Sequence, residues 1–536
     1  MTGYDVDVLV AGAGPVGLMA ASRLARSGVS VRLVDAATGP ATTSRALGSH
    51  ARSLEIYDQL GILGEIAPHG TRINTFVIHQ DGRPNRLDFN FDGLPTRFPY
   101  MFNVDQVIIE RVLRGDAAST GVAVEWNTKL ESFQYDDDAV TAVLHSGDGT
   151  EETVRARYLW GCDGGHSTVR KTLQLPLTGE SAHAWLIADA IVHTDVDIDG
   201  VHWLFPPGGA LMLFPFPEPG KWRLLDTSGE GQPENPEQIA RQFSTKLTQA
   251  LGRDTVVDSP SWTSKFTIQQ RAVPAMHVGR CFVSGDAAHV HSPASGQGLN
   301  TGIQDAHNLA WKLAMVIHGH ADPTLLDTYD AERVPIGQAL LTSTSEVMNT
   351  VMVSQTRTTQ GSTGSMDSVD SARGFQRQLI RNMSGLAISY PESPLTVPGD
   401  KPGEGPRPGE RLTQLSAADA QSPGWTILRA KLRSPAWHLL VFTGSEDATG
   451  KDHLTTETGS LPPWVNAETI SQQRPDDDHG VWDPDGRVHD TLAATDGDWI
   501  LVRPDGYLSA RGTGGTSLHA ALNRLTSLHT SEPARA

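Results

Sequence analysis

The chain has few cysteines and fewer basic than acidic residues, and each of these shortages excludes some kinds of structure or partner. Its 536 residues contain two cysteines, and the formal net charge at pH 7 is −19. Two cysteines do not make a disulfide framework, so we expect Cys162 and Cys281 to be buried thiols in a reducing cytoplasm. The excess of negative charge disfavours nucleic acid and anionic membrane surfaces as partners.

Long apolar runs and targeting signals are also missing. No stretch of about 18 apolar residues occurs, so we expect no membrane-spanning helix. The N-terminus leads into an apolar strand at Asp5 without a basic and apolar leader. No Cys-x-x-Cys pair is present, which excludes dithiol chemistry, and we assign no metal ligands. The length allows two or three domains with sizeable cores, and a homodimer is left open.

The first positive signal is a glycine-rich turn near the N-terminus. Residues 5–11 predict a buried parallel strand, after which Gly12, Gly14 and Gly17 have the G-x-G-x-x-G spacing. The first glycine permits a tight turn, the second lets backbone approach a pyrophosphate, and the third lets a helix pack closely. A helix starting near Pro15 would point its free N–H groups at the phosphates. This pattern predicts a dinucleotide site.

A second strand, residues 29–34, ends at Asp35. An acid at this position is suited to accept hydrogen bonds from the hydroxyls of the adenosine ribose. The N-terminal unit alone does not separate NAD from FAD.

A second motif lies nearly 300 residues further along the chain. Residues 280–285 predict a strand that ends in a turn, and Asp286 follows where its carboxylate would accept from ribityl hydroxyls. Gly296 and Gly298 then precede a predicted helix over residues 301–316. Free N–H groups at the start of that helix would stabilise negative charge on a reduced flavin ring. A cofactor held at both ends by distant segments favours FAD over NAD.

A third segment, residues 158–170, predicts a strand, an Asp-Gly turn and a helix start. Taken alone, Asp163 and Arg170 are more often a turn residue and a solvated helix charge. In their order and spacing, however, the three segments resemble the single-component FAD-dependent aromatic hydroxylases. That family includes the p-hydroxybenzoate, phenol and pentachlorophenol hydroxylases and the tailoring oxygenases of aromatic polyketides. Residues 44–55 resemble its loop and helix after the second strand, and residues 103–113 resemble its next helix.

The resemblance implies a role for each motif residue. Asp163 would serve both FAD and a transiently bound NADH or NADPH, and Arg170 would support the same motif. Leu47 takes the place where phenol hydroxylases carry an acid, which leaves the substrate base unidentified. The remaining FAD contacts implied by the resemblance are Gly12, Gly14, Pro15, Gly17 and Asp35 at the ADP half, Arg45, Gln106 and Asp286 at the pyrophosphate and ribityl chain, and Pro293, Gly296, Gly298, Leu299 and Asn300 against the isoalloxazine ring.

The family mechanism implies that NADPH or NADH reduces FAD and that O2 forms a flavin C4a-hydroperoxide, which hydroxylates the substrate, and we expect a phenolic, polycyclic aromatic. A dry cavity protects such an intermediate, and a base that deprotonates the phenol speeds oxygen transfer. Pro293, His50, Arg52 and Arg223 are the candidates for the catalytic centre.

The sequence pattern along the chain predicts an α/β fold with three parts. A discontinuous, Rossmann-like FAD-binding domain takes residues 1–75, 100–180 and 268–350, and a sheet-rich substrate domain takes residues 76–99 and 181–267. Residues 351–409 predict a helix and linker, and residues 410–536 resemble the C-terminal thioredoxin-like domain of phenol and polyketide hydroxylases. The candidate pocket residues are Leu47 and the aromatic side chains of Trp203, Phe205, Phe214, Phe216 and Trp222, each of which is equally compatible with plain core.

Three alternatives stay open at this stage. The same fold also supports Baeyer–Villiger insertion into a polyketide ketone, which an ester or lactone carbonyl in the product would reveal. A flavin-binding sensor without turnover predicts no NAD(P)H oxidation stimulated by an aromatic ligand. An NAD-dependent dehydrogenase predicts a colourless protein.

Overall fold

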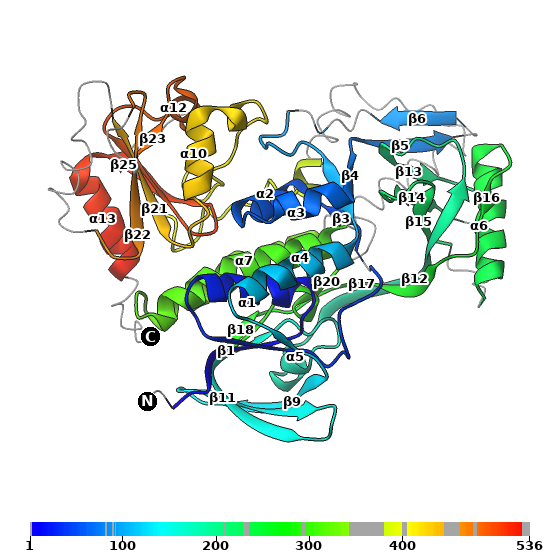
Figure 1. Cartoon of the computed structure of the whole chain (residues 1–536), viewed down its shortest axis with the longest axis horizontal. Helices are drawn as coiled ribbons and strands as arrows, with labels where there is room; N and C mark the ends of the chain where they lie inside the picture. The colour runs from blue at the N-terminus through cyan, green and yellow to red at the C-terminus, as the bar shows by residue number, and fades with distance from the viewer. Residues whose placement is uncertain are drawn as a thin grey trace.

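The computed structural model describes most of the chain. The described residues are 3–44, 46–80, 83–87, 91, 93–206, 209–228, 235–291, 296–341, 380–398, 405–443, 461–474 and 480–527. Three bodies are visible, each built on its own sheet (Figure 1). The predicted α/β class is confirmed, whereas the domain boundaries given above stay a prediction.

The first body, called the flavin-type body below, is a parallel sheet covered by helices. Strand β1 (Val6–Ala11) lies between β2 (Val31–Val34) and β11 (Glu151–Gly161), and all three strands run parallel. The outer parallel neighbours are β8 (Val124–Glu125) and β19 (Cys281–Val283). Val8, Leu9 and Val10 are fully buried, as expected for a strand that is covered on both faces.

Three helices lie together against this sheet, α1 (Pro15–Arg26), α4 (Gln106–Ser119) and α7 (Gln297–Ile317) (Figure 1). Residues 327–341 are also helical. An antiparallel extension of the sheet is formed by β9 (Thr128–Tyr135), β10 (Val140–Ser146) and β18 (His277–Val278). The predicted helix over residues 103–113 begins only at Gln106, because Asn103 and Val104 belong to strand β7.

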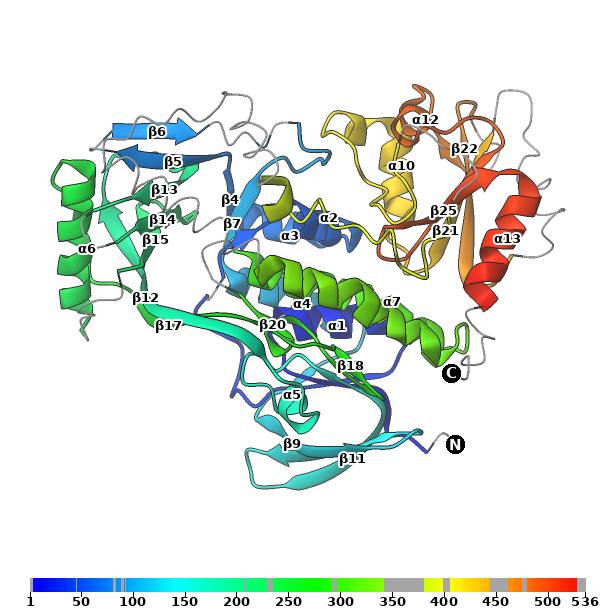
Figure 2. The same ribbon diagram turned by 180° about the vertical axis from the view of Figure 1, so that it is seen from behind.

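The second body is a nine-stranded sheet that two long strands join to the first. Strands β12 (Thr178–His193) and β17 (Trp262–Ala272) pair antiparallel from Thr178↔Ala272 to Asp189↔Trp262 and run out from the flavin-type body (Figure 2). Helix α6 (Pro236–Leu251) packs on the outer face of this sheet. The other strands of the sheet are β5 (Thr75–Gln80), β6 (Arg83–Leu87), β13 (Gly200–Leu204), β14 (Leu211–Pro215), β15 (Lys221–Asp226), β16 (Val256–Val257) and β20 (His289–Val290).

A small three-stranded sheet lies between the two larger bodies. Strand β7 (Met101–Val104) pairs antiparallel with β3 (Gly48–Ser49) and with β4 (Gly70–Ile73). Helices α2 (Ala51–Gln59) and α3 (Leu63–Ile66) follow β3. This sheet fixes the segment that contains Leu47 and Gly48, because the Val104 N–H donates to the Leu47 carbonyl at 2.9 Å.

The third body is a mixed five-stranded sheet near the C-terminus. Strand β21 (Trp437–Thr443) is buried throughout and lies between β22 (Val465–Ser471), which is parallel, and β24 (Asp498–Val502), which is antiparallel. The edge strands are β23 (Val481–Trp482) and β25 (Leu508–Thr513), and the helices are α10 (Pro423–Lys431), α12 (Arg487–Leu492) and α13 (Gly514–Ser527). This arrangement is consistent with the thioredoxin-like prediction, and β24 and β25 pair antiparallel as a hairpin.

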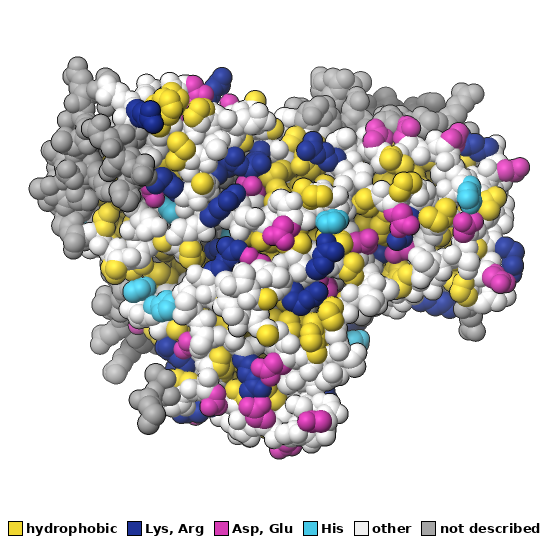
Figure 3. Space-filling view, in the orientation of Figure 1, with side chains coloured by type: hydrophobic (Ala, Val, Ile, Leu, Met, Phe, Trp, Pro, Cys, Tyr) yellow, Lys and Arg dark blue, Asp and Glu magenta, His cyan; other side chains and the backbone are white. Residues whose placement is uncertain are grey.

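The surface and the thiols agree with the composition. Lys and Arg side chains are interspersed with Asp and Glu over the face in Figure 3. Cys162 and Cys281 are both buried and unpaired as disulfides, as predicted, and burial raises the pKa of Cys281 to about 12. Within the described ranges, no helix is long and apolar enough to span a bilayer.

Candidate active site

Packing requires two of the three glycines in the N-terminal turn, whereas the third faces open space. Gly12 has a φ of 101°, and a Cβ there would collide with the Cys162 carbonyl. A Cβ on Gly17 would collide with the Gly12 carbonyl oxygen. Gly14, the N-cap residue of α1, has nothing within 4 Å of an added Cβ. The N–H groups of the first helical turn therefore face free space beside Gly14, which is a cradle suited to a pyrophosphate.

Asp35 fastens this turn from the next strand. Its Oδ2 accepts the Ala13 N–H at 2.6 Å, and its Oδ1 accepts the Ala37 N–H at 2.8 Å. The carboxylate thus fixes the backbone that would surround a dinucleotide. Its contact with a ribose stays a prediction.

The second motif supplies a carboxylate and a helix start. Asp286 lies in a short 3-10 turn (Gly285–Ala287), and its exposed side chain lines a cavity. Gly296 has φ 61° and ψ 21° and caps α7, so the helix begins at Gln297, earlier than predicted. Asn300 Nδ2 donates to the carbonyls of Gly48 and Gly296 at 2.9 and 2.6 Å, and its Oδ1 accepts from the His50 backbone. The Asn300 side chain therefore positions the start of α7.

The third motif connects with the second. Asp163 Oδ2 accepts the N–H groups of Thr168 and Val169 at 2.7 and 3.2 Å and so caps α5 (Thr168–Thr172). Its Oδ1 is buried and has no hydrogen-bond partner in the part of the chain that the structure describes. Arg170 Nη1 donates to the Ala287 carbonyl at 3.3 Å, which ties the Asp-Gly turn to the Asp286 turn.

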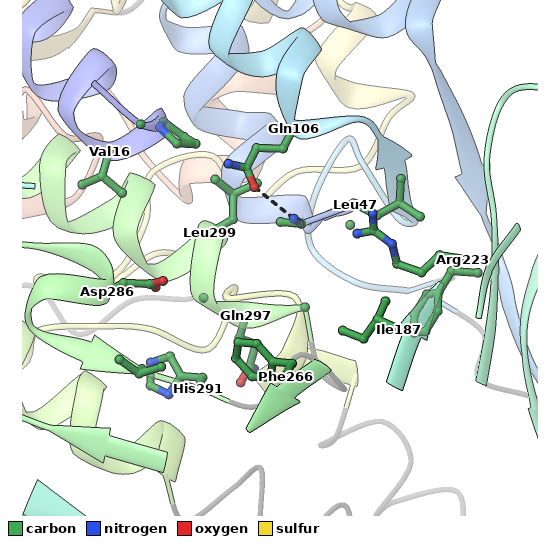
Figure 4. Close-up of a pocket in the computed structure, with 18 of the residues that line it drawn as sticks. Val16, Leu47, Gln106, Ile187, Arg223, Phe266, Asp286, His291, Gln297 and Leu299 are labelled. Carbon is green, nitrogen blue, oxygen red and sulfur yellow. Dashed lines mark hydrogen bonds between the residues drawn. The ribbon is translucent and has the colours of Figure 1, made fainter. Parts of the chain in front are cut away.

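Of three further predicted cofactor residues, the structure describes one, Gln106. Gln106 Oε1 accepts the Ala46 N–H at 2.9 Å, and its Nε2 donates to Glu110 at 2.7 Å. Gln106 lines the cavity, as Figure 4 shows. Arg45 and Pro293 lie outside the described residues, so their assigned roles stay predictions.

One cavity of about 330 Å³ joins these motifs to the nine-stranded sheet. Its walls come from both bodies, so a ligand that fills it contacts the glycine turn and the sheet together (Figure 4). The flavin-type body contributes Gly14, Leu47, Gln106, Asp286, Gly298 and Leu299. The sheet contributes Phe76, Ile187, Phe214, Arg223, Leu225 and Phe266.

The alternation of the strands decides which predicted pocket aromatics reach the cavity. In β15, Arg223 and Leu225 face the cavity, so Trp222 and Leu224 face α6. Trp222 is 1 % exposed and packs in the core beneath α6, so its assignment to the pocket was wrong. Phe214 does line the cavity, as does Leu47.

Three other aromatic candidates do not contact the cavity. Trp203 and Phe205 belong to the hydrophobic cluster on the inner face of the sheet, beside the cavity. Phe216 is buried, and Arg223 lies over its ring at 5.5 Å. Since Leu211–Pro215 is apolar on both faces, the sequence alone could not orient these rings.

Among the basic candidates, Arg223 lines the cavity, and its catalytic role stays a prediction. It makes a two-pronged ion pair with the buried Asp189, with both N–O distances at 2.8 Å. Its Nη2 also donates to the Ser44 carbonyl at 2.7 Å, and the guanidinium lies over the Trp262 ring at 5.1 Å. Arg223 thus connects the nine-stranded sheet to the loop before Leu47.

The two other basic candidates lie elsewhere. Arg52 donates to Glu55 at 3.0 Å and to the Asp505 carbonyl at 2.8 Å and lies over the Tyr507 ring, so it contacts the C-terminal body. Its placement in or near the cavity was wrong. His50 is buried at the N-cap of α2, close to Gly296, and does not line the cavity.

Sequence reasoning also missed residues that the structure brings to the site. Phe76, Ile187 and Phe266 lie on strands whose inward face could not be identified before α6 was placed. His291 and Gln297 line the cavity as well, and both flank the Pro293 segment. The only signal for His291 was a His-x-His pattern next to a motif that was already recognised.

The residues fit an FAD. The open cradle at Gly14, the cavity carboxylate of Asp286 and the start of α7 follow one another along a single cavity. The buried Oδ1 of Asp163 and Oε1 of Gln297 have no partners among the described residues, as expected of atoms that serve a ligand.

Known proteins resemble this chain over most of its length. Residues 5–344 match the family model described as "FAD binding domain". The chain is 42% identical to 6-methylpretetramide 4-monooxygenase of Streptomyces rimosus over 97% of this chain and 93% of the relative. It is 30% identical to pentachlorophenol 4-monooxygenase of Sphingobium chlorophenolicum, over 95% and 94%. The solved complex of aklavinone-11 hydroxylase with FAD and aklavinone superimposes with a TM-score of 0.72 and 26% identity, covering 98% of this chain and 100% of that one.

Proposed function

Because the chain belongs to the FAD-dependent family of aromatic monooxygenases, we propose that it hydroxylates a phenolic, polycyclic aromatic of polyketide type. The enzyme takes FAD as its cofactor, and we assign NADPH or NADH and O2 as its co-substrates. One observation carries the substrate class: the cavity that begins at the FAD cradle ends against Phe214, Phe266 and Ile187 of the nine-stranded sheet. Similarity to a monooxygenase named for a polycyclic polyketide supports the same class.

The residues of the flavin-type body would hold the cofactor. The free backbone N–H groups in the first turn of α1, beside Gly14, would face the pyrophosphate, Asp286 would accept from the ribityl hydroxyls, and the start of α7 at Gly298 would meet the ring. When bound and reduced, FAD supplies the electrons that activate O2 for transfer of one oxygen atom.

The residues of the sheet would bind and orient the substrate. Phe214 and Phe266 offer ring faces and edges to an aromatic, and such pairs contribute about 0.5–1.5 kcal/mol each beyond area burial. Ile187 and Leu225 would exclude water from the same wall, and a dry cavity limits side reactions that compete with oxygen transfer. Arg223, whose charge is balanced by Asp189, gives this wall a polar edge that can orient a substrate oxygen.

The test is the oxidation of NADPH and of NADH by the FAD-loaded enzyme in the presence of phenols of one to four fused rings. We expect polycyclic phenols to stimulate oxidation and to gain one oxygen atom from labelled O2, which NMR then places on a ring carbon. A product with a new ester or lactone carbonyl would replace hydroxylation with Baeyer–Villiger insertion. Flavin binding without stimulation by any phenol would contradict enzymatic turnover of this class.

A matched pair of variants locates the substrate wall. Phe214→Ala removes a ring from the cavity, so we expect a higher KM for the polycyclic substrate and unchanged FAD binding. Phe243→Ala removes a ring of the same size from α6 on the other side of the sheet, so it should lower stability without a selective effect on KM. Equal KM changes in both variants would place the substrate elsewhere.

A further inference from the structure

A row of buried hydrogen bonds leads from the cavity wall into the interior, and the roles assigned so far do not use it. His291 Nε2 lies 3.1 Å from His289 Nδ1, and His289 Nε2 lies 2.6 Å from Asp305 Oδ2. The exposed fractions fall along this row, from 6 % at His291 to 1 % at His289 and 0 % at Asp305. His291 lines the cavity (Figure 4), so the row begins at the active site.

The inner end of the row carries a fixed negative charge. Asp305 Oδ1 accepts from Arg333 Nε at 2.8 Å, and Oδ2 also accepts the Gly285 N–H at 3.1 Å. Burial alone raises the pKa of Asp305, but His289 and Arg333 outweigh it and hold the pKa below its usual value. Arg333 in turn donates to the Tyr390 hydroxyl at 2.9 Å. Asp305 is therefore an ionised carboxylate that only accepts hydrogen bonds.

This charge sets the tautomer of both histidines. Because Asp305 only accepts, His289 Nε2 carries a proton in either charge state, and in the resting state of the relay proposed below the His289 ring is neutral and offers Nδ1 as an acceptor. His291 Nε2 must therefore donate to His289, which leaves a lone pair on His291 Nδ1. That Nδ1 is buried and has no hydrogen-bond partner among the described residues. Burial and the neighbouring His289 lower the pKa of His291 to about 3, in agreement with a neutral ring.

A second buried acceptor lies along the same cavity. Gln297 Oε1 also has no partner among the described residues, and Figure 4 shows Gln297, Phe266 and His291 on one side of the cavity. Buried acceptors without donors are costly unless a ligand supplies the donor. The cavity therefore fits a ligand that brings an O–H group to this end.

We propose that His291 accepts the phenolic proton of the bound substrate through Nδ1 and passes charge to His289, which Asp305 holds in position. This inference rests on the proposed phenolic substrate. The substrate O–H bond breaks as an N–H bond forms at His291 Nδ1, and the proton on His291 Nε2 moves to His289 Nδ1. The products are a phenolate in the cavity and an imidazolium at His289, next to the Asp305 carboxylate.

The two-step transfer explains how a histidine of low basicity serves as a base. A charge that stayed on His291 would be buried at the cavity wall, whereas a charge on His289 is 2.6 Å from a carboxylate oxygen. The other titratable or charged groups near this row are Arg333, Tyr329 and Cys162 on the inner side and Asp286 at the cavity. Burial, together with the Asp305 charge, raises the pKa of both Tyr329 and Cys162, so both stay protonated and neither competes as a proton acceptor.

The first test observes the proton transfer without turnover. The probe is 1,4-dihydroxyanthraquinone, whose phenolate absorbs at longer wavelength than oxidised flavin, titrated into the oxidised holoenzyme over a range of pH. We expect the wild type to lower the apparent pKa of the bound dye by at least about one unit, a tenfold change in ionisation. His291→Gln and His289→Asn should bind the dye, as flavin fluorescence reports, yet lose this shift.

A second histidine pair provides the matched control. His79 Nε2 and His202 Nδ1 lie 2.9 Å apart and are buried, but neither lines the cavity. His79→Gln should therefore keep the wild-type ionisation of the dye. If His291→Gln and His289→Asn ionise the dye as the wild type does, the relay is wrong, while stimulated NADPH oxidation would still support the proposed function.

The second test needs no ligand. In holoenzyme labelled with ¹⁵N at histidine, we expect His291, identified by its loss in His291→Gln, to show a proton on Nε2 and an unprotonated Nδ1 at neutral pH. A proton on Nδ1 or a charged ring would overturn the proposal. In turnover, the deficit of His291→Gln should be about tenfold to hundredfold in kcat and should shrink as rising pH ionises the phenol in solution.

Discussion

The two ends of helix α7 lie in opposite kinds of surroundings. At its N-terminal end, Gln297 lines the cavity with a buried oxygen that has no partner among the described residues. Further along, Asn308, Trp311 and Lys312 are all hydrogen-bonded to Glu332 or Asp505. Figure 2 shows α7 running from the centre of the molecule toward the five-stranded sheet. Helix α7 thus has an unpartnered polar atom at the cavity, whereas Asn308, Trp311 and Lys312 are paired with carboxylates where the bodies join.

The saturated end is a buried ion network. Arg503, from the C-terminal body, donates to Glu332 at 2.6 and 2.8 Å and to Asp505 at 2.6 and 3.0 Å. Lys312 donates to Glu332 at 2.8 Å. Burial raises the pKa of Glu332, but Arg503 and Lys312 outweigh it and hold the pKa far below its usual value. Because the network is complete, loss of one member leaves charges without partners.

The largest effect that tests the contrast between the two ends of α7 is expected from Glu332→Gln. The change leaves Arg503 and Lys312 buried without their carboxylate, so the free energy of unfolding should fall by about 3–5 kcal/mol. Urea denaturation of the holoenzyme measures the loss. The control is Glu152→Gln, in which the same change affects a half-exposed partner of Arg32 and should cost about 0–1 kcal/mol. Equal losses in the two variants would mean that the buried junction is no more sensitive to the loss of a carboxylate charge than the surface is.

The same carboxylate predicts a pH dependence. Its folded pKa is lowered from the usual 4.5, so its stabilisation is complete above that value and is lost as pH falls below it. The stability difference between wild type and Glu332→Gln should therefore narrow below about pH 4.5. A difference that widens on acidification would contradict an ionised Glu332.

The second prediction contrasts the two faces of the nine-stranded sheet, at Trp222 of β15 and at Phe214 of β14. Trp222→Ala removes a ring from the core under α6 and should lower the free energy of unfolding by about 3–5 kcal/mol. The cavity-lining Phe214→Ala, which removes a partly buried ring, should cost less stability. Thermal unfolding of both variants measures this. A neutral Trp222→Ala would restore that ring to the pocket.

Local patterns predicted the parts of the site that depend on neighbouring residues. The strand, turn and helix around Gly12 and the Asp286 turn were recognised from spacing, and the family inferred from them is confirmed. The start of α7 was placed four residues late, because Gly296 enters the left-handed region and lets the helix begin directly after it. A helix start of this kind is not predicted when glycine is treated only as a residue that ends helices.

The sequence did not predict roles that depend on distant partners. The sequence around Arg52 does not show whether its side chain faces the cavity or the C-terminal body. Asp505 and Tyr507, which orient it, lie more than 450 positions away along the chain. Trp222 and Arg223 are adjacent, yet only the placement of α6 tells which of them faces the cavity. Partners far apart along the chain decide both cases, and no local periodicity encodes them.

The third prediction tests the reassignment of Arg52. Arg52→Lys keeps the charge but loses the fork that reaches both Glu55 and the Asp505 carbonyl. We expect a loss of about 1–2 kcal/mol in the free energy of unfolding, with kcat and KM close to the wild type. Denaturation and steady-state kinetics on one preparation measure both quantities. A large fall in kcat with full stability would return Arg52 to the catalytic centre.

The smallest effect on stability, and the sharpest on ligand binding, is expected from Gly14→Ala. An added Cβ at Gly14 meets nothing within 4 Å, and the φ of −70° suits alanine, so unfolding of the apoprotein should change by less than about 0.5 kcal/mol. The same methyl group would occupy the cradle where backbone approaches the pyrophosphate, so FAD should bind at least about tenfold more weakly. Gly17→Ala, whose Cβ would collide with the Gly12 carbonyl, should instead lower stability directly. Flavin fluorescence titration and apoprotein denaturation separate the two outcomes. If Gly14→Ala binds FAD as tightly as the wild type, the open space beside α1 is not the cofactor cradle. The cavity at the N-terminal end of α7 would then no longer be supported as the FAD site.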